Sequence, residues 1–567
     1  MEWAPRWNRS CAPLAAIASR EAVRAMRRPG LIGRGAPLAL AALLILSTGT
    51  ACMSTDTPYS VETRDLGQIE RDLASGRVSS EALVGLYIAR IHAIDGKTRA
   101  VLAIAPDALD QARASDAWRR SNPARPLEGV PVLIKDNIET ADALPTTAGS
   151  LALAHNVTGR DAPLVARLRA AGAIILGKTN LSEWANMRGD RSISGWSGVG
   201  GQTRNAFALD RTPCGSSSGS GVAVAASLAP LAIGTETDGS VTCPASISGL
   251  VGLKPTVGLV SRNRIIPISV SQDTAGPMTR TVADAARLLS VIAGSDPADP
   301  ATAAADRHRT DYAASLDRQA LAGKRIGVLR FLAGYHPALD AVFDHALDRM
   351  RGAGATLVEI PSFDGMDAIG AAERLVLLTE LKAGLAAYLA DSPVRDQPQT
   401  LAALIAFNQA HADRELALFG QELFLKAEAT DGMQAPAYLA ARAESLRRAG
   451  PDGIDRMLAQ SHLDALVAPT GPPAWMIDFV DGDNDLGAAS TLPAVAGTPH
   501  LTVPMGQVAG LPVGLSFLGP AWSEAALLSL GYAFEAVRAT PGGPGAASAD
   551  APLAAPTFPA TIQPPLR

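Results

Sequence analysis

The sequence predicts an α/β fold built on a largely buried β-sheet. From about residue 60 to 540, short apolar runs alternate with segments of helical periodicity, which is the pattern of a sheet covered by helices. Residues 130–134 (VPVLI) form an almost continuous apolar run and predict a buried strand. Residues 161–172 predict a helix, so strand and helix signals follow one another along the chain.

The helix predicted over residues 161–172 carries the clearest local signals. Asp161 supplies an N-cap, Pro163 stands in the first turn and Gly172 ends the helix. The other expected elements are strands at 130–134 and 173–176, a helix of small residues at 221–228 and a mainly helical region at 364–450.

Length and composition allow one large hydrophobic core or two medium ones, because the chain has 567 residues and is 47% hydrophobic. A formal net charge of −5 and the lack of a Lys/Arg-rich block argue against nucleic acid or an acidic membrane as a partner. The eight histidines are scattered, and no Cys/His spacing suggests zinc. We therefore expect no metal and no cofactor.

The first 52 residues predict a leader rather than part of the domain. Residues 26–34 are basic and residues 36–46 are apolar but too short to span a bilayer, which is typical of a secretory signal. Small residues then precede Cys52, as at the processing site of a bacterial lipoprotein. Ordinary cleavage after Ala51 and a buried core segment are the alternatives. We expect a periplasmic protein, or a lipoprotein anchored in a bacterial envelope through Cys52.

The expected domain boundaries follow from this leader. They are residues 1–25 as a leader with a start codon placed too far upstream, 26–52 as the signal peptide, 60–540 as the folded domain and 541–567 as an Ala/Pro-rich disordered tail. Of the four cysteines, only Cys214 and Cys243 remain for the folded domain. Two cysteines are too few for a disulfide framework.

Residues 172–179 (GAIILGKT) match the phosphate-binding pattern G-x-x-x-x-G-K-[ST] letter by letter. A phosphate-binding loop needs a strand before its first Gly and a helix beginning at its Lys. Here a predicted helix precedes Gly172, and the next four residues are apolar and strand-like. This order of elements argues against nucleotide binding.

The stretch Pro213–Gly221 (PCGSSSGSG) contains four serines and fits the pattern G-x-S-x-G, with Ser217 as the nucleophile of an α/β-hydrolase. That motif needs a buried strand directly before it. Residues 205–214 instead contain a Pro and a charged pair, and the required histidine would have to be His462 or His500. The fit is poor.

Several sequence blocks in register give a better account of these serines. The chain resembles the amidase signature family at residues 129–138 (GVPVLIKDNI), 213–221 and 231–246 (LAIGTETDGSVTCPAS), and the resemblance extends from residue 60 to 535. Further blocks are 177–184 (GKTNLSEW), 252–258 (GLKPTVG), 272–277 (QDTAGP) and 511–514 (LPVG). The resemblance implies the amidase signature fold, which is a large mixed, twisted β-sheet flanked by helices on both sides in a single compact domain.

The resemblance also implies a set of catalytic residues. In the family a lysine, a serine held in a cis peptide and a second serine form the triad, and these correspond to Lys135, Ser216 and the nucleophile Ser240. The oxyanion hole is then expected to consist of the backbone N–H groups of Thr237, Asp238, Gly239 and Ser240.

Three residues of the same loops are expected to contact substrate, namely Asp238, Gly215 and Ser217. For Ser217, local hydrogen bonding within its loop is the other interpretation, and it applies to Ser218 as well. Asp238 fits two roles equally well, because it can bind a substrate N–H or cap a turn.

The triad requires an unusual lysine. A serine hydroxyl becomes an effective nucleophile only when a base takes its proton during attack. A lysine is such a base only when neutral, and an ordinary pKa near 10.4 leaves less than about one molecule in a thousand neutral at pH 7. Because Lys135 follows Leu133 and Ile134 in an apolar strand, we expect burial to lower its pKa.

The block at residues 237–244 (TDGSVTCP) departs from many family members, because Val241 and Thr242 stand where relatives place Ile and Arg. This variant resembles the peptide amidase branch, whose members release ammonia from C-terminal carboxamides of peptides. We expect an exported, monomeric serine amidohydrolase that acts on a small-molecule or peptide amide and binds no nucleic acid. The alternatives are an amidotransferase A-type subunit that supplies ammonia to a tRNA-bound substrate, and an envelope lipoprotein that binds without catalysis.

Overall fold

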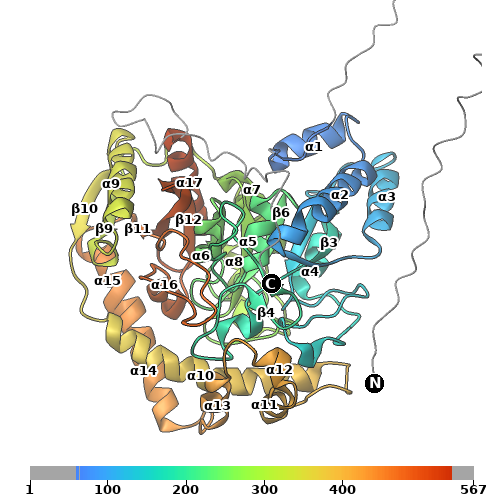
Figure 1. The fold of residues 1–567 in the computed structure, drawn as a ribbon. Helices are drawn as coiled ribbons and strands as arrows, with labels where there is room; N and C mark the ends of the chain where they lie inside the picture. The colour runs from blue at the N-terminus through green and yellow to red at the C-terminus, as the bar shows by residue number, and fades with distance from the viewer. Residues whose placement is uncertain (1–58, 63, 539–567) are drawn as a thin grey trace, which may run out of the picture. The chain divides into compact units, whose positions relative to one another are not determined.

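A mixed sheet of 11 strands runs through the part of the chain that the structure describes, residues 59–62 and 64–538 of a computed structural model (Figure 1). In spatial order its strands are β1 (Val101–Ile104), β3 (Ile174–Thr179), β2 (Pro131–Lys135), β6 (Leu231–Glu236), β8 (Thr274–Thr279), β7 (Val251–Lys254), β12 (His500–Val508), β13 (Leu511–Leu518), β11 (Ala465–Pro469), β9 (Arg325–Leu329) and β10 (Thr356–Ile360). The pairs β2–β3, β2–β6, β9–β10 and β9–β11 are parallel. A separate ribbon pairs β4 (Trp196–Ser197) with β5 (Gly201–Gln202).

Helices flank this sheet, as the resemblance implies. One connected layer consists of α4 (Pro163–Ala170), α7 (Val282–Ile292), α17 (Glu524–Arg538) and α9 (Pro337–Gly352). Helices α5 (Ser218–Ala225) and α6 (Thr242–Ile247) contact each other and the central strands. The N-terminal helices are α1 (Leu66–Ala74), α2 (Ser80–Thr98) and α3 (Ala108–Arg119).

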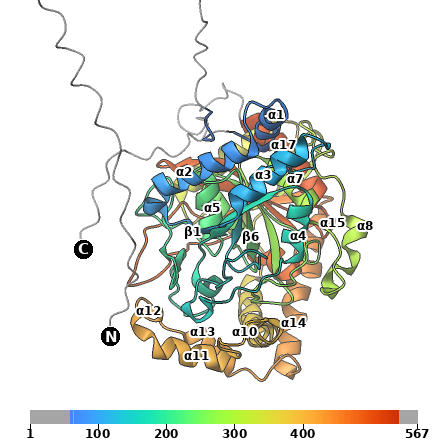
Figure 2. The ribbon, with the colours of Figure 1, turned by 90° about the vertical axis from the view of Figure 1, so that its right-hand side faces the viewer.

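The predicted helical region 364–450 is confirmed. Figure 1 shows it at the bottom and Figure 2 shows it from the side, gathered along one end of the sheet. It comprises α10 (Met366–Asp391), α11 (Leu401–Ala410), α12 (Ala412–Glu415), α13 (Glu422–Glu428) and α14 (Pro436–Ala449). Leu381 and Leu385 of α10 pack in one apolar cluster with Phe424 and Trp184, which fixes α10 against the loop that follows β3. The remaining α-helices are α8 (Ala305–His308), α15 (Arg456–Gln460) and α16 (Thr491–Ala496).

Helix α5 is built from small residues because other backbone segments approach it closely. A Cβ atom at Gly219 would lie 2.3 Å from the carbonyl oxygen of Ala100 and 2.5 Å from that of Asn180. All eight residues of the helix are buried. The sequence predicted this helix three residues too late, because its first turn is formed by the serines of the Gly/Ser loop.

The strands predicted at 130–134 and 173–176 are confirmed as β2 and β3, with ends shifted by one to three residues. The predicted N-cap Asp161 is wrong, because α4 begins after Ala162, which makes no side-chain capping bond. Asp161 instead accepts a hydrogen bond from the backbone N–H of Ala141 at 2.6 Å and pairs with Arg169. Residues 172–179, which match the phosphate-binding pattern, run from the end of a helix into a strand, so they lack the geometry of a phosphate-binding loop.

The predicted leader (residues 1–25), signal peptide (26–52) and C-terminal tail (541–567) lie outside the described residues. Within the described part of the chain, no helix has the length and apolarity needed to cross a membrane.

Candidate active site

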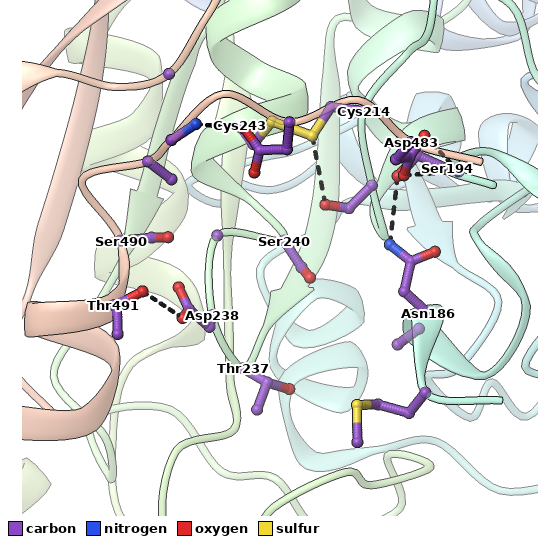
Figure 3. A pocket seen from close by; sticks show the side chains of 18 of the residues that line it. Asn186, Ser194, Cys214, Thr237, Asp238, Ser240, Cys243, Asp483, Ser490 and Thr491 are labelled. Atoms are coloured by element: carbon purple, nitrogen blue, oxygen red, sulfur yellow. Dashed lines mark hydrogen bonds between the residues drawn. A yellow bond between two sulfur atoms is a disulfide. The ribbon is translucent and has the colours of Figure 1, made fainter. Parts of the chain in front are cut away.

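A pocket of about 310 Å³ lies beside the turn that follows β6, and Ser240 forms part of its wall (Figure 3). Its lining residues come from segments far apart in the sequence, within 185–194, 214–215, 237–243, 268 and 471–491. Leu377 adds a contact from α10, so the helical region contributes to the wall of the pocket. The pocket is therefore a meeting point of loops that the sheet and the helical region hold in place.

Lys135 is the last residue of β2, and its side chain is fully buried beside this pocket. Its Nζ atom lies 2.8 Å from Ser216 Oγ, 3.0 Å from Ser217 Oγ and 2.8 Å from Thr235 Oγ1. Burial lowers the pKa of Lys135 to about 7, although the charges of Asp273 and Glu236 act in the opposite direction. A substantial fraction of the molecules therefore carries neutral Lys135 at neutral pH.

Ser216 sits in the Gly/Ser loop that leads into α5. The peptide bond between Gly215 and Ser216 is cis, and the Ser216 side chain is fully buried. Its carbonyl oxygen accepts a hydrogen bond of 3.1 Å from the backbone N–H of Ser182. A larger residue than glycine at the preceding position would displace Ser182, because a Cβ atom on Gly215 would lie 2.1 Å from Ser182 Oγ.

Ser240 lies in the turn between β6 and α6 and lines the pocket. The carboxylate of Glu236 accepts hydrogen bonds from the N–H groups of Val241 at 2.8 Å and Thr242 at 2.9 Å, which fixes the turn. The backbone N–H of Ser217 donates to the carbonyl oxygen of Ser240 at 3.1 Å. Lys135 and the two serines of the predicted triad thus lie on β2 and two adjoining loops.

Four residues of the turn between β6 and α6 line the pocket. Among the described residues, none of their backbone N–H groups donates a hydrogen bond to the protein. Backbone donors left free beside a nucleophile are what an oxyanion hole requires. The four residues are those predicted from the sequence, Thr237, Asp238, Gly239 and Ser240.

Cys214 and Cys243 form a disulfide with an S–S distance of 2.02 Å, a pairing that the sequence analysis did not predict. Cys214 lies two residues before Ser216, and Cys243 lies three residues after Ser240. The bond therefore joins the two loops that carry the predicted serines, and both cysteines line the pocket (Figure 3). The pairing could have been predicted from the sequence, because each cysteine lies close to a predicted catalytic serine.

Asp238 takes part in a pair of buried carboxyl groups. Its Oδ2 atom accepts a hydrogen bond from Thr491 Oγ1 at 2.8 Å, a contact between distant segments rather than a turn cap. Burial raises the pKa of Asp238 to about 6. Burial, together with the charge of Asp238, raises the pKa of Glu373 to about 8, and Gln272 Nε2 donates to Glu373 Oε1 at 2.7 Å. When the two carboxyl groups share one proton, Glu373 therefore carries it. Asp238 is then ionised and can accept hydrogen bonds at the pocket.

Not every predicted residue reaches the pocket. Gly215 lines it, whereas Ser217 is fully buried against Lys135 and the carbonyl oxygen of Thr235, so its position suits a structural role rather than contact with substrate. The histidines required by the α/β-hydrolase interpretation lie elsewhere. His500 is buried in β12, where its Nε2 lies 2.6 Å from Ser516 Oγ, and His462 follows α15. Ser217 therefore has no histidine partner.

Other pocket residues were missed by sequence reasoning because they lie on loops without a motif. Asp483 accepts hydrogen bonds from the backbone N–H of Ser194 at 3.1 Å and from Trp475 Nε1 at 3.2 Å. Asp485 and Asn186 line the pocket as well. No Lys, Arg or His is among the described lining residues, so carboxyl groups supply all the charged side chains of the pocket.

The fold has the architecture of a known class of amide hydrolases. A family model described as Amidase matches residues 82–528, and the chain belongs to this family, the amidase signature family. The protein is an enzyme that hydrolyses an amide C–N bond.

The named relatives are amidases and amidotransferase components. A peptide amidase structure from Stenotrophomonas maltophilia has 52% sequence identity and a TM-score of 0.80, and the match covers 84% of this chain and 98% of that one. A protein named "Probable amidase" from Arabidopsis thaliana is 38% identical over 88% of this chain and 94% of its own length. The A-type component of a glutamyl-tRNA(Gln) amidotransferase from Roseiflexus castenholzii is 38% identical over 83% of this chain and 95% of its own length.

Proposed function

We propose that the protein hydrolyses the C-terminal carboxamide of peptides to the acid and ammonia, with Ser240 as nucleophile and Ser216 and Lys135 as its proton relay. The observation that carries the proposal is the contact of 2.8 Å between Lys135 Nζ and Ser216 Oγ, because a buried lysine with a pKa of about 7 is the base that this chemistry needs. The 52% identity to a peptide amidase favours this substrate over that of the amidotransferase relatives, at 38%.

The proposed reaction has two stages. Ser240 Oγ attacks the carboxamide carbon while its proton passes through Ser216 to neutral Lys135. The resulting oxyanion accepts hydrogen bonds from the free N–H groups of the turn at residues 237–240. The C–N bond then breaks, and the nitrogen takes the proton back along the same relay and leaves as ammonia. Water hydrolyses the acyl-Ser240 ester in the second stage, with the relay acting in the same way.

Asp238 is proposed to hold the peptide in register for this attack. Its Oδ1 atom is buried and has no hydrogen-bond partner among the described residues, and Asp238 lines the pocket. A backbone N–H of a peptide is a suitable donor for this oxygen, because an unpartnered buried acceptor costs free energy until it is paired. Gly215, in the Gly/Ser loop, lines the same pocket.

We further propose that the protein is exported, with Cys52 as the point of processing and lipid attachment. The disulfide between Cys214 and Cys243 supports this proposal independently of the leader sequence, because disulfides persist mainly in oxidising compartments such as the periplasm. Mass spectrometry of the mature N-terminus distinguishes the outcomes. A lipidated Cys52 is expected, whereas an unprocessed chain beginning upstream of residue 52 contradicts export.

The activity is tested by measuring ammonia release and the mass of the product with a short peptide amide and the full chain. Ser240→Ala should lower the rate by at least about a thousandfold, as expected for loss of a nucleophile. Ser217→Ala is the matched control, and it should keep the rate within about tenfold, because it removes only one hydrogen bond to Lys135. Loss of activity only in Ser217→Ala would contradict the proposal, as would cleavage of internal peptide bonds instead of the terminal amide.

A further inference from the structure

A second, smaller cavity adjoins the active-site pocket on the side of Lys135. It has a volume of about 30 Å³, and its walls include Asn137, Thr235, Asp273 and Thr274. Three residues lie in the walls of both cavities, Ala185, Thr237 and Ile268. The small cavity is thus separated from the pocket only by residues that line both.

The walls of the small cavity carry polar atoms that lack partners within the protein. Asn137 is 5% exposed and Thr274 is 1% exposed, and among the described residues neither Asn137 Oδ1 nor Thr274 Oγ1 has a hydrogen-bond partner. Thr235 Oγ1 accepts from Lys135 Nζ at 2.8 Å and from Asn137 Nδ2 at 3.0 Å. Among the described residues, no acceptor receives the hydroxyl hydrogen of Thr235, so this hydroxyl can donate one further hydrogen bond.

Size and polarity together identify the ligand class of this cavity. A volume of about 15 Å³ holds one water molecule, so about 30 Å³ has room for two. A buried water needs two to four polar partners, and Asn137 Oδ1, Thr274 Oγ1 and Thr235 Oγ1 supply them together with the carboxylate of Asp273. Buried polar atoms of this kind are almost always hydrogen-bonded in native proteins.

We propose that this cavity is a water-binding site that supplies the water for hydrolysis of the acyl-enzyme. The role rests on the proposed function. When the acyl part of a peptide fills the main pocket, water needs another approach to the ester, and the small cavity borders Thr237 of the predicted oxyanion turn. The oxygen of the water forms a bond with the acyl carbon, and its proton passes through Ser216 to Lys135. The bond from the acyl carbon to Ser240 Oγ breaks, and Ser240 regains a proton from the relay.

The test compares Thr274→Val, which keeps the shape of the side chain but removes its hydroxyl, with Thr274→Ser, which keeps the hydroxyl. Thr279→Val is the control for loss of a buried hydroxyl on the same strand outside the cavity, because Thr279 Oγ1 bonds to the carbonyl oxygen of Thr281. Each full-length protein is assayed with a peptide amide and with the p-nitrophenyl ester of the same peptide. We expect acylation to limit turnover of the amide, because its leaving group is poor, and deacylation to limit turnover of the ester, because its leaving group is good. Crystal structures of the wild type and Thr274→Val are compared for ordered water in the cavity.

We expect ordered water bonded to Asn137 Oδ1 and Thr274 Oγ1 in the wild type and its loss or displacement in Thr274→Val. The kcat for the ester should fall about fivefold or more in Thr274→Val, the effect of one lost hydrogen bond, and should recover in Thr274→Ser. A dry cavity in the wild type overturns the water site, and an ester kcat that is unchanged or falls equally in Thr279→Val overturns its role. A wild type that hydrolyses neither substrate refutes the proposed function, and the crystal structures then decide the water site on their own.

Discussion

Lowering the pH through 7 should switch off the proposed base, Lys135. Burial lowers the pKa of this lysine to about 7, so roughly half of the molecules are neutral at pH 7 and about one in eleven at pH 6. We therefore expect kcat/KM to rise about tenfold from pH 6 to pH 8 and then to level off. A lysine with an ordinary pKa near 10.4 would give a rise of about a hundredfold over the same interval, and the rise would continue above pH 8.

The assay is initial-rate ammonia release at peptide amide concentrations far below KM, from pH 5 to pH 9. Three carboxyl groups near the site also titrate in this range, because burial raises the pKa of Asp238 and of Asp273 to about 6 and that of Glu373 to about 8. Glu373→Gln removes one of these titrations and leaves Lys135 in place. Asp273→Asn removes a negative charge that raises the pKa of Lys135, so it should move the acid limb to lower pH.

A hundredfold rise from pH 6 to pH 8 in the wild type would refute the assignment of a low pKa to Lys135. An acid limb that stays at the same pH in Asp273→Asn, while Glu373→Gln shifts it, would assign the limb to the carboxyl pair instead. Either result would remove the physical basis for Lys135 as the base.

Three further outcomes follow from the described contacts. Replacing both Cys214 and Cys243 by Ala should lower the free energy of unfolding by about 3–4 kcal/mol, the chain-entropy value for a sequence separation of 29, and urea denaturation with unchanged midpoints would contradict it. In the wild type, kcat/KM should be higher for a peptide amide with Arg beside the terminal residue than for one with Glu there. Asp485→Asn should lower the ratio of these two kcat/KM values by about two- to fivefold, since an exposed ion pair contributes little. Gly215→Ala should cut kcat/KM about a hundredfold through displacement of the Ser216 loop, as measured by ammonia release, whereas Gly85→Ala, whose Cβ meets nothing within 4 Å, should not.

The elements that the sequence predicts best are those whose residues face only one kind of environment. The apolar run of β2 is buried on both faces, and it was predicted to within one residue. The start of α4 was misplaced because Asp161 has a suitable capping side chain, but Arg169 and the Ala141 N–H bind it instead. Such competition between a local cap and distant partners cannot be seen in a single sequence, which is why helix ends are less predictable than strand cores.

The pocket residues also differ in whether local sequence or distant contacts determine their position. Lys135, Ser216 and Ser240 could be predicted because they lie in contiguous blocks that resemble a family. Asp483 and Asp485 were not, since they come from an irregular loop that reaches the pocket only through tertiary contacts such as the bond from Trp475 Nε1 to Asp483. The position of Asp483 and Asp485 in the pocket depends on which segments the fold brings together. Neither the spacing of residues nor the composition of the chain carries that information.

The charge of the pocket bears on product release as well as on binding. A carboxamide is neutral, whereas the acid formed from it is an anion at neutral pH, and the charged side chains of the described lining, Asp238, Asp483 and Asp485, are all carboxyl groups. Repulsion between like charges is strong in a partly desolvated site, so the product should bind less tightly than the substrate. The proposed oxyanion hole preserves this difference in affinity, because its N–H donors are neutral. An arginine after Ser240, where this chain has Val241 and Thr242, would attract both the product carboxylate and the oxyanion of the transition state.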